Sequence, residues 1–327
     1  MKLPLFCALA LATRLPVFAA VEEPIDHRFK PAATDPLVGD WSGAAGFVAQ
    51  VTLDEHGDYQ ANLLTAFEAD HNLMATLRGQ AGKDPVTLRG GGWSGRIEQG
   101  HFKGSKDAAN FDLQHVVRAS PTLGAKPPAG AVVLFDGKNM DAFANKKGKE
   151  WLVEDGPAPW KIVDGGILEV VPGTGGGIIT HQKFGDCHLH VEFRTLGAPS
   201  NSGVFLQTRY EADIGESYAH TEGSSCGNLG NCTPKGTFPR VRAGRAPLEW
   251  QTFDIDFTAP RFDPAGNKTA PARMTVVLNG SKIYDQQELN MPTGAAGRLG
   301  EAATGPLMLQ EHGMPLQFRN IWLTPTH

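Results

Sequence analysis

Apolar and polar residues alternate in short segments along most of this chain, as they do in β-strands with one buried face. The alternation is clearest from Cys187 to Phe193, where every second residue is apolar. Glycine, aspartate and asparagine separate the segments, and no stretch of eleven residues keeps a convincing helical period. The sequence therefore predicts an all-β protein built of short antiparallel strands.

The segments form two blocks. The first, residues 37–120, predicts a small all-β domain, an antiparallel meander or barrel, with no cluster of residues that looks catalytic. Residues 121–130 are rich in proline and glycine, which predicts a linker. The second block, residues 131–327, predicts a β-sandwich of two antiparallel sheets in a jelly-roll arrangement. Its expected strands include 132–135, 160–163, 167–171, 187–193, 250–257, 274–278, 307–309 and 316–322.

Residues 201–218 have the pattern of a single extended strand with two unlike faces. One face is apolar, and the other carries Gln207, Arg209, Glu211 and Asp213, with Phe205 among them. Such a strand can form the floor of a binding site, or it can be an ordinary half-solvated strand. Alternation alone leaves both interpretations open.

Composition and the N-terminus narrow the class of protein. A net charge of −5 argues against a general nucleic-acid binder, which needs a basic surface. The first twenty residues have a basic start, an apolar middle and small residues at the end, so we expect a signal peptide at 1–20, cleaved near Ala19 or Ala20. A membrane anchor is the alternative, but the apolar run is short and Arg14 interrupts it. We therefore expect a periplasmic or secreted protein without a membrane span.

Three cysteines follow the expected cleavage point. Cys226 and Cys232 bracket a glycine-containing loop and predict a small disulfide, whereas a metal pair at these positions lacks the second pair that a zinc site needs. Cys187 begins an apolar alternation and is expected to be a buried thiol.

The second block resembles the 3-keto-disaccharide hydrolase family, long catalogued as a domain of unknown function and built on a concanavalin-like sandwich. Each motif is weak by itself, but their order over most of the block is specific, whereas the first block resembles only an N-terminal extension of some members. The motifs are Leu134–Lys138, Trp160 ahead of 164–168, 178–180, 184–186, Asn201–Leu206, Tyr210-Glu211, 249–251, Asn279-Gly280, 309–313 and 318–321. The chain departs from the family at Asp213 (usually Gln), Glu216 (usually Asp), Cys187 (usually aromatic) and His181 (usually Lys).

The resemblance implies cleavage of glycosides that carry a ketone at C3 of the sugar. The ketone acidifies the C2 proton, so a general base can remove it, and the glycosidic oxygen then leaves from C1 before water adds. Glu211 and His312 are the candidate catalytic residues. Residues Asn201, Trp160, Gln310, Arg319 and Arg209 are the candidate substrate-binding residues, and Asp213 and Glu216 are candidate ligands of a divalent cation such as Ca²⁺.

Each of these residues also has a structural interpretation. Glu211 can pair with Arg209 or Arg319, and His312 beside Gly313 can belong to a turn. Two other functions remain open. A conventional glycoside hydrolase would use Glu211 and Asp213 as its two carboxylates, and a lectin-like protein would bind carbohydrate without cleaving it. The oligomeric state and the linkage of the glycoside cannot be predicted from the sequence.

Overall fold

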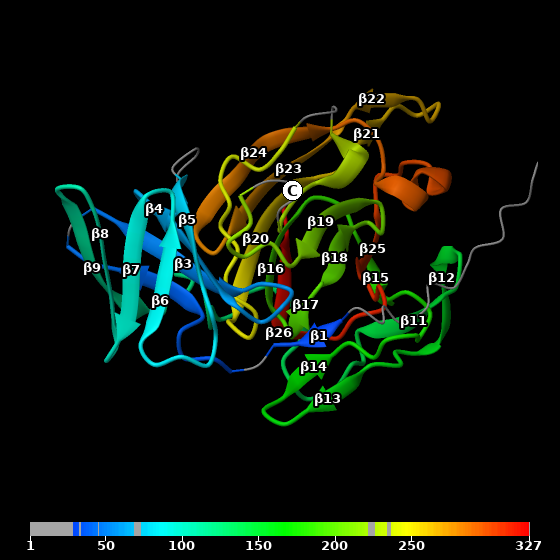
Figure 1. Ribbon diagram of the computed structural model, residues 1–327. Helices are drawn as coiled ribbons and strands as arrows, with labels where there is room; N and C mark the ends of the chain where they lie inside the picture. The colour runs from blue at the N-terminus through cyan, green and yellow to red at the C-terminus, as the bar shows by residue number, and fades with distance from the viewer. Residues whose placement is uncertain are drawn as a thin grey trace, which may run out of the picture.

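The computed structural model describes residues 29–32, 34–44, 46–68, 73–221, 226–233 and 237–326, so the predicted signal peptide lies outside the described residues. The strands between Gly39 and Val116 form a closed antiparallel barrel in which each strand pairs with the next and the last with the first (Figure 1). This confirms the small antiparallel β-domain. The barrel strands are β2 (Gly39–Ser42), β3 (Val48–Leu53), β4 (Tyr59–Leu64), β5 (Leu73–Gly79), β6 (Val86–Gly90), β7 (Trp93–Glu98), β8 (His101–Lys106) and β9 (Ala109–Val116).

Side chains fill the interior of the barrel. Trp41 and Phe102 meet edge to face with ring centroids 6.1 Å apart, and Phe102 meets Phe111 in the same way at 5.1 Å. A Cβ atom at Gly104 would lie 2.3 Å from the Phe111 ring, so only glycine leaves room for that ring. This interior is a packed core, as expected for a barrel of eight strands.

Two large antiparallel sheets form the sandwich of the second block, which confirms the prediction. Two short pairs lie outside these sheets: β21 (Arg261–Phe262) with β22 (Lys268–Ala270), and β1 (Lys30–Pro31) with β17 (Gly197–Ala198). The eight-stranded sheet runs β13-β14-β26-β16-β20-β23-β24, with β10 also paired to β26, and the six-stranded sheet runs β12-β11-β15-β25-β18-β19. The first sheet consists of β10 (Val132–Phe135), β13 (Lys161–Val163), β14 (Ile167–Glu169), β16 (Cys187–Thr195), β20 (Gln251–Thr258), β23 (Ala272–Leu278), β24 (Ser281–Leu289) and β26 (Leu316–Pro325). The second consists of β11 (Phe143–Lys147), β12 (Glu150–Pro157), β15 (Ile178–Phe184), β18 (Asn201–Leu206), β19 (Tyr210–Gly215) and β25 (Gly305–Leu309).

The main core lies between these two sheets. Alternate residues of each strand point into it, including Leu189 and Phe193 of β16 and Val204 of β18. Cys187 is buried there as a thiol, as the alternation predicts. Two short 3₁₀ helices, η1 (Gly230–Cys232) and η2 (Gly294–Leu299), follow sheet strands, and no helix in the described part of the chain is long and apolar enough to cross a membrane.

The stretch 201–218 is a hairpin and not one strand. Its strands β18 and β19 are joined by the three-residue turn Gln207–Arg209, in which Gln207 and Thr208 have positive φ, 55° and 58°. Such turns normally contain asparagine or glycine, and neither is present, so the sequence lacked the usual signal. The turn is held from outside, because Thr208 donates to Pro306 O at 2.9 Å and the Gln207 amide donates to Ala303 O at 3.0 Å.

The predicted disulfide between Cys226 and Cys232 is contradicted. Both side chains are buried thiols, and each lies against a different backbone carbonyl: Cys226 Sγ is 3.7 Å from Asp213 O, and Cys232 Sγ bonds to Leu229 O. The spacing of two cysteines around a flexible loop permits a bridge but does not orient the Sγ atoms toward each other.

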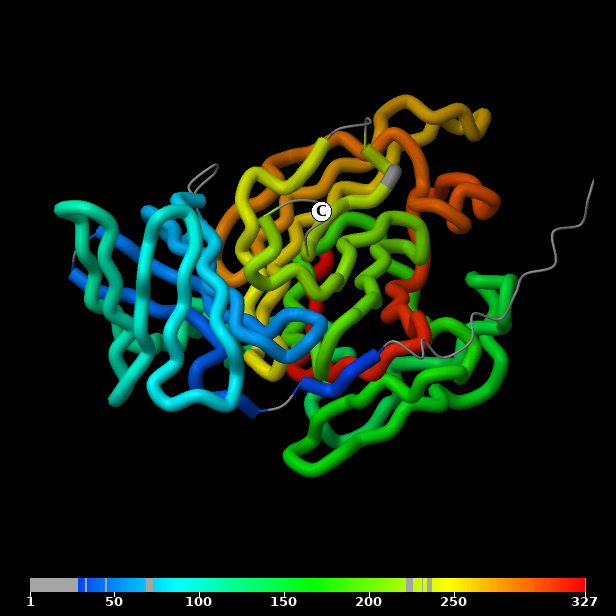
Figure 2. The backbone as a smooth tube through the Cα atoms, viewed as in Figure 1, coloured from blue at the N-terminus to red at the C-terminus, as the bar shows by residue number. Residues whose placement is uncertain are grey.

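The proline-rich segment 121–130 does not extend freely between the domains. Thr122 and Gly124 bond to side chains of β20 and β16 on the outer face of the eight-stranded sheet. The barrel also contacts the loop after β19: Tyr218 donates to Asp40 Oδ1 at 2.8 Å, and Asn62 donates to Ala219 O at 2.5 Å. Figure 2 shows the barrel lying beside the sandwich along this side.

Candidate functional site

The candidate site lies on the outer face of the six-stranded sheet, the side that points away from the main core. The register of β18 and β19 sets Phe205 opposite Glu211 and Gly203 opposite Asp213. On the other side of β18, Phe205 pairs with Met308 of β25, and Gln310 N donates to Gly203 O at 2.9 Å. Glu211, Asp213, Gly203 and Gln310 therefore lie side by side on one face, as the alternation predicted for the two carboxylates.

Burial changes the acidity of Glu211. Desolvation raises the pKa of its carboxyl group to about 8, and the nearby negative charge of Asp213 contributes to the increase. Its backbone is fixed as well, because Glu211 N donates to Thr293 Oγ1 at 3.1 Å in the loop before η2. A carboxylate with a pKa near neutrality is suited to accept a proton from carbon or to exchange one with substrate.

Asp213 has a similar environment. Burial raises its pKa to about 7, and its backbone bonds to the loop that covers the edge of β19: Asp213 N donates to Asn228 O, and Gly227 N donates to Asp213 O.

Gly203 provides the space in which Glu211 sits. A Cβ atom at position 203 would lie 2.5 Å from Glu211 Oε1 and 3.0 Å from the Phe205 ring. Beside it, Gln310 Oε1 is buried and has no hydrogen-bond partner among the described residues. A buried acceptor without a donor is costly, and at a functional site a substrate hydroxyl can satisfy it.

Apolar side chains occupy the neighbouring part of this face. Ile179, Phe205 and Met308 form a separate buried cluster, and Trp151 of β12 packs edge to face on Phe205 with ring centroids 5.9 Å apart. The Arg298 guanidinium of η2 lies 5.0 Å from the Trp151 ring. The β11–β12 hairpin thus reaches over the sheet toward η2.

Lys146 and Glu311 hold the glycine-rich loop 173–177 at the edge of the same face. The Lys146 ammonium donates to Gly175 O at 3.0 Å, and the Glu311 carboxylate accepts from Gly173 N and Gly176 N at 3.2 and 3.1 Å. Burial lowers the pKa of Lys146 to about 8, and Arg298 contributes to the decrease. Sequence reasoning missed both residues because they belong to polar runs that do not indicate burial.

Asn201 is the first residue of β18, and His312 lies beyond the end of β25. Asn201 has the same parity as Gly203 and so belongs to the outer face. His312 follows Gln310 by two residues and lies in the connection between β25 and β26. Glu311 fixes this turn by accepting a hydrogen bond from Gly313 N at 2.6 Å.

Three of the predicted substrate-binding residues lie elsewhere. Trp160 is 4% exposed and stacks on Phe318 in the main core, so it cannot stack on a sugar. Arg319 lies on β26 of the other sheet and pairs with Glu192. Arg209 is buried in the turn, where it donates to Gly300 O at 2.6 Å and does not pair with Glu211. Alternation predicts the face of a strand but not which sheet holds it.

The predicted cation ligands do not form a cluster. No group of three or more histidine, cysteine or acidic side chains suited to a metal occurs among the described residues. Glu216 accepts a hydrogen bond from Tyr218 N at 3.0 Å, and its other oxygen lies 3.3 Å from His220. A divalent cation at Asp213 and Glu216 remains a prediction.

The second block is similar to solved structures and to a known protein family. A Parabacteroides distasonis protein named "putative glycosyl hydrolase", with a structure at 2.13 Å, is 31% identical with a TM-score of 0.52, covering 61% of this chain and 85% of that one. A second from the same organism is 17% identical with a TM-score of 0.44, covering 61% and 94%. A comparison with curated proteins finds no match.

This similarity identifies the second block as glycosyl hydrolase-like and carbohydrate-active. Residues 130–324, more than half of the chain, match the model of the 3-keto-alpha-glucoside-1,2-lyase-like domain. The chain belongs to this family.

Proposed function

We propose that the protein cleaves the glycosidic bond of glycosides oxidised at C3, with Glu211 as the general base. The observation that carries this proposal is the environment of Glu211, a carboxylate whose pKa burial raises to about 8. The same face holds Gln310 Oε1, a buried acceptor with no partner in the described part of the chain. Family membership supports the substrate class.

In the proposed reaction the Glu211 carboxylate takes the proton from C2, and the electron pair of that bond forms the enolate with the C3 ketone. The enolate re-forms the ketone as the C1–O bond breaks, which leaves a double bond between C1 and C2. The leaving oxygen takes a proton, for which His312 is the proposed donor. Water then adds at C1 while C2 regains a proton. Gln310 Oε1 accepts a hydrogen bond from a sugar hydroxyl.

The test offers the purified protein a 3-keto-glucoside beside the unoxidised parent glucoside. We expect sugar release from the keto compound alone. Release from the parent would favour the conventional hydrolase with Glu211 and Asp213 as its carboxylates, and binding of either compound without release would favour a lectin-like protein.

Asp213 offers a direct test of the acidity of Glu211. Asp213→Gln removes a negative charge that contributes to the high pKa of Glu211. The pKa should fall, and the rising limb of kcat/KM against pH should move to lower pH. A pH profile on the keto substrate measures the shift. Glu216→Gln is the matched control, since Glu216 pairs with His220 and should leave the limb in place. An upward move or an unchanged limb in Asp213→Gln would contradict the assignment.

A further inference from the structure

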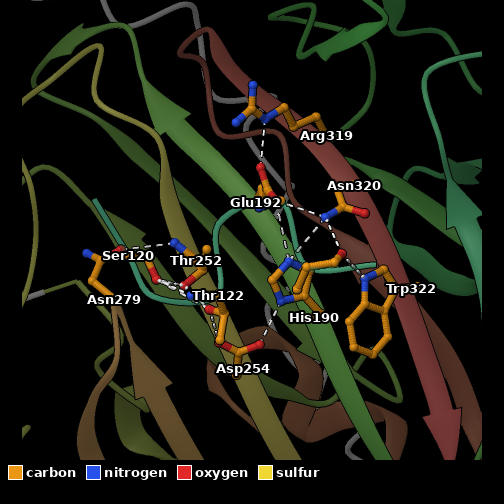
Figure 3. Close-up of polar contacts among 12 residues, drawn as sticks. Ser120, Thr122, His190, Glu192, Thr252, Asp254, Asn279, Arg319, Asn320 and Trp322 are labelled. Carbon is orange, nitrogen blue, oxygen red and sulfur yellow. Dashed lines mark hydrogen bonds and ion pairs between the residues drawn. The ribbon is translucent and has the colours of Figure 1, made fainter. Parts of the chain in front are cut away.

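A second polar cluster lies on the opposite side of the sandwich. His190 and Glu192 of β16 point away from the main core, yet the side chain of His190 is 0% exposed and that of Glu192 is 1% exposed. Trp322 stacks on the His190 ring with centroids 5.0 Å apart, and the segment Arg118–Ala125, here called the strap, leads from the barrel to the sandwich and bonds to the carboxylates beside the ring. Figure 3 shows His190 between Asp254 and Glu192, with Ser120 and Thr122 beside them.

The strap bonds directly to the two carboxylates that flank His190. Thr122 Oγ1 donates to Asp254 Oδ2 at 2.6 Å, and Gly124 N donates to Glu192 Oε1 at 2.6 Å. Asn320 ties down the next residue of the strap by donating to Ala125 O at 2.9 Å. Two further amides close turns within the strap, since Leu123 N bonds to Ser120 O and Ala125 N to Thr122 O.

The cluster under the strap has balanced charges only when His190 is protonated. Its Nδ1 lies 2.6 Å from Asp254 Oδ1 and its Nε2 lies 3.6 Å from Glu192 Oε1, while Arg319 of β26 donates to Glu192 Oε2 at 2.7 Å. Two carboxylates thus face one guanidinium and one imidazole. Between Ala119 and Ala125 the strap carries no ionisable side chain, so it brings no compensating charge.

A bulge in β26 brings both cationic and amide donors to Glu192. Asn320 has a φ of 45°, and the register against β16 shifts there, so the consecutive residues Arg319 and Asn320 both reach Glu192. Although burial acts to raise it, the pKa of Glu192 falls to about 2 because of the hydrogen bonds from His190, Asn320, Gly124 and Arg319. Glu192 therefore stays ionised under the strap at all moderate pH values.

We propose that the strap is a proton-linked latch, which fastens the barrel to the outer face of the eight-stranded sheet when His190 is charged and loosens when His190 loses its proton. Loss of that proton leaves an unbalanced negative charge beneath the strap, and lifting the strap lets water solvate it.

The direction of the pH dependence follows from the shift of His190. Burial acts to lower its pKa, but the hydrogen bonds and charges of Asp254 and Glu192 raise it above the ordinary value. A raised pKa means that the stabilisation is complete below the ordinary value near 6.5 and is lost as the pH rises through the raised value. The strap should therefore loosen as the pH rises above the ordinary value for histidine.

Hydrogen exchange at the strap tests the latch in the full chain. Protection of the amides of Leu123, Gly124 and Ala125 is measured by mass spectrometry from pH 5.5 to pH 9 and corrected for the intrinsic rate. Protection should fall as the pH rises through the pKa of His190. The total fall should be about ten-fold for each unit by which the pKa of His190 is higher with the strap closed than with the strap open. His190→Gln should remove this pH step.

His188→Gln is the matched control. His188 lies on β16 like His190 and pairs with Asp256 of β20 at 2.7 Å, but its side chain is 35% exposed. It should leave the step in place. If His190→Gln fails to fold, NMR can follow the titration of the His190 ring in the unmodified chain. The pKa of the ring must then coincide with the pH at which protection of the strap amides falls. Protection that does not vary with pH, or a step that follows His188, would overturn the proposal.

Discussion

Glu211→Gln should abolish cleavage of a 3-keto-glucoside and leave the protein folded. The amide has the shape of the carboxylate but cannot take the C2 proton, and general-base catalysis commonly contributes about 10²–10⁴-fold. The variant should also be more stable at high pH. The folded pKa of Glu211 is raised to about 8, so the unmodified chain loses stability as the pH rises from about 4.3, the usual value for glutamate, toward 8. Turnover assays and unfolding at pH 4 and pH 8 measure both effects.

Glu249→Gln separates the two effects. Burial also raises the pKa of Glu249 to about 7, but its electrostatic partners are Asp40, Arg245 and Arg118 at the junction with the barrel. The control should show a similar gain in stability at pH 8 and keep its turnover. If Glu211→Gln retains the activity of the unmodified chain, another group is the base.

Much of the fold follows from the sequence because alternation reports burial one residue at a time. The sandwich core agrees with it: Cys187, Leu189, Val191 and Phe193 all point inward. What alternation does not report is pairing between distant strands. β26 and β18 belong to different sheets, so Arg319 of β26 does not lie on the face that holds Glu211, contrary to the prediction.

The candidate site was predictable in part for the same reason. Glu211 and Asp213 share a face by parity, and the register confirms it. The turn at Gln207-Thr208 was not predictable, because external bonds to Ala303 and Pro306 hold a conformation that the local residues disfavour. The strap was likewise misjudged, since a proline-rich composition indicates turns but not the side chains on which those turns rest.

Gly203→Ala should cost nearly as much activity as the loss of the base itself. Gly203 lies in β18 with ordinary extended backbone, so alanine brings no backbone strain and only its added carbon matters. That carbon would lie 2.5 Å from Glu211 Oε1 and 3.0 Å from Glu211 Cγ, so the carboxylate must move aside. A displacement near 1 Å of a reacting group can cost about 10²-fold in rate. Measured kcat/KM on the keto substrate should fall accordingly.

Gly215→Ala is the control on the next strand. Its added carbon would lie 3.7 Å from Asp213 Oδ2, an ordinary contact that requires no movement. This variant should keep the activity of the unmodified chain, and both variants should unfold at similar denaturant concentrations. Equal activity in the two would mean that the position of the Glu211 carboxylate over Gly203 does not matter to the reaction. A selective loss in Gly203→Ala would tie catalysis to the space that the missing side chain provides.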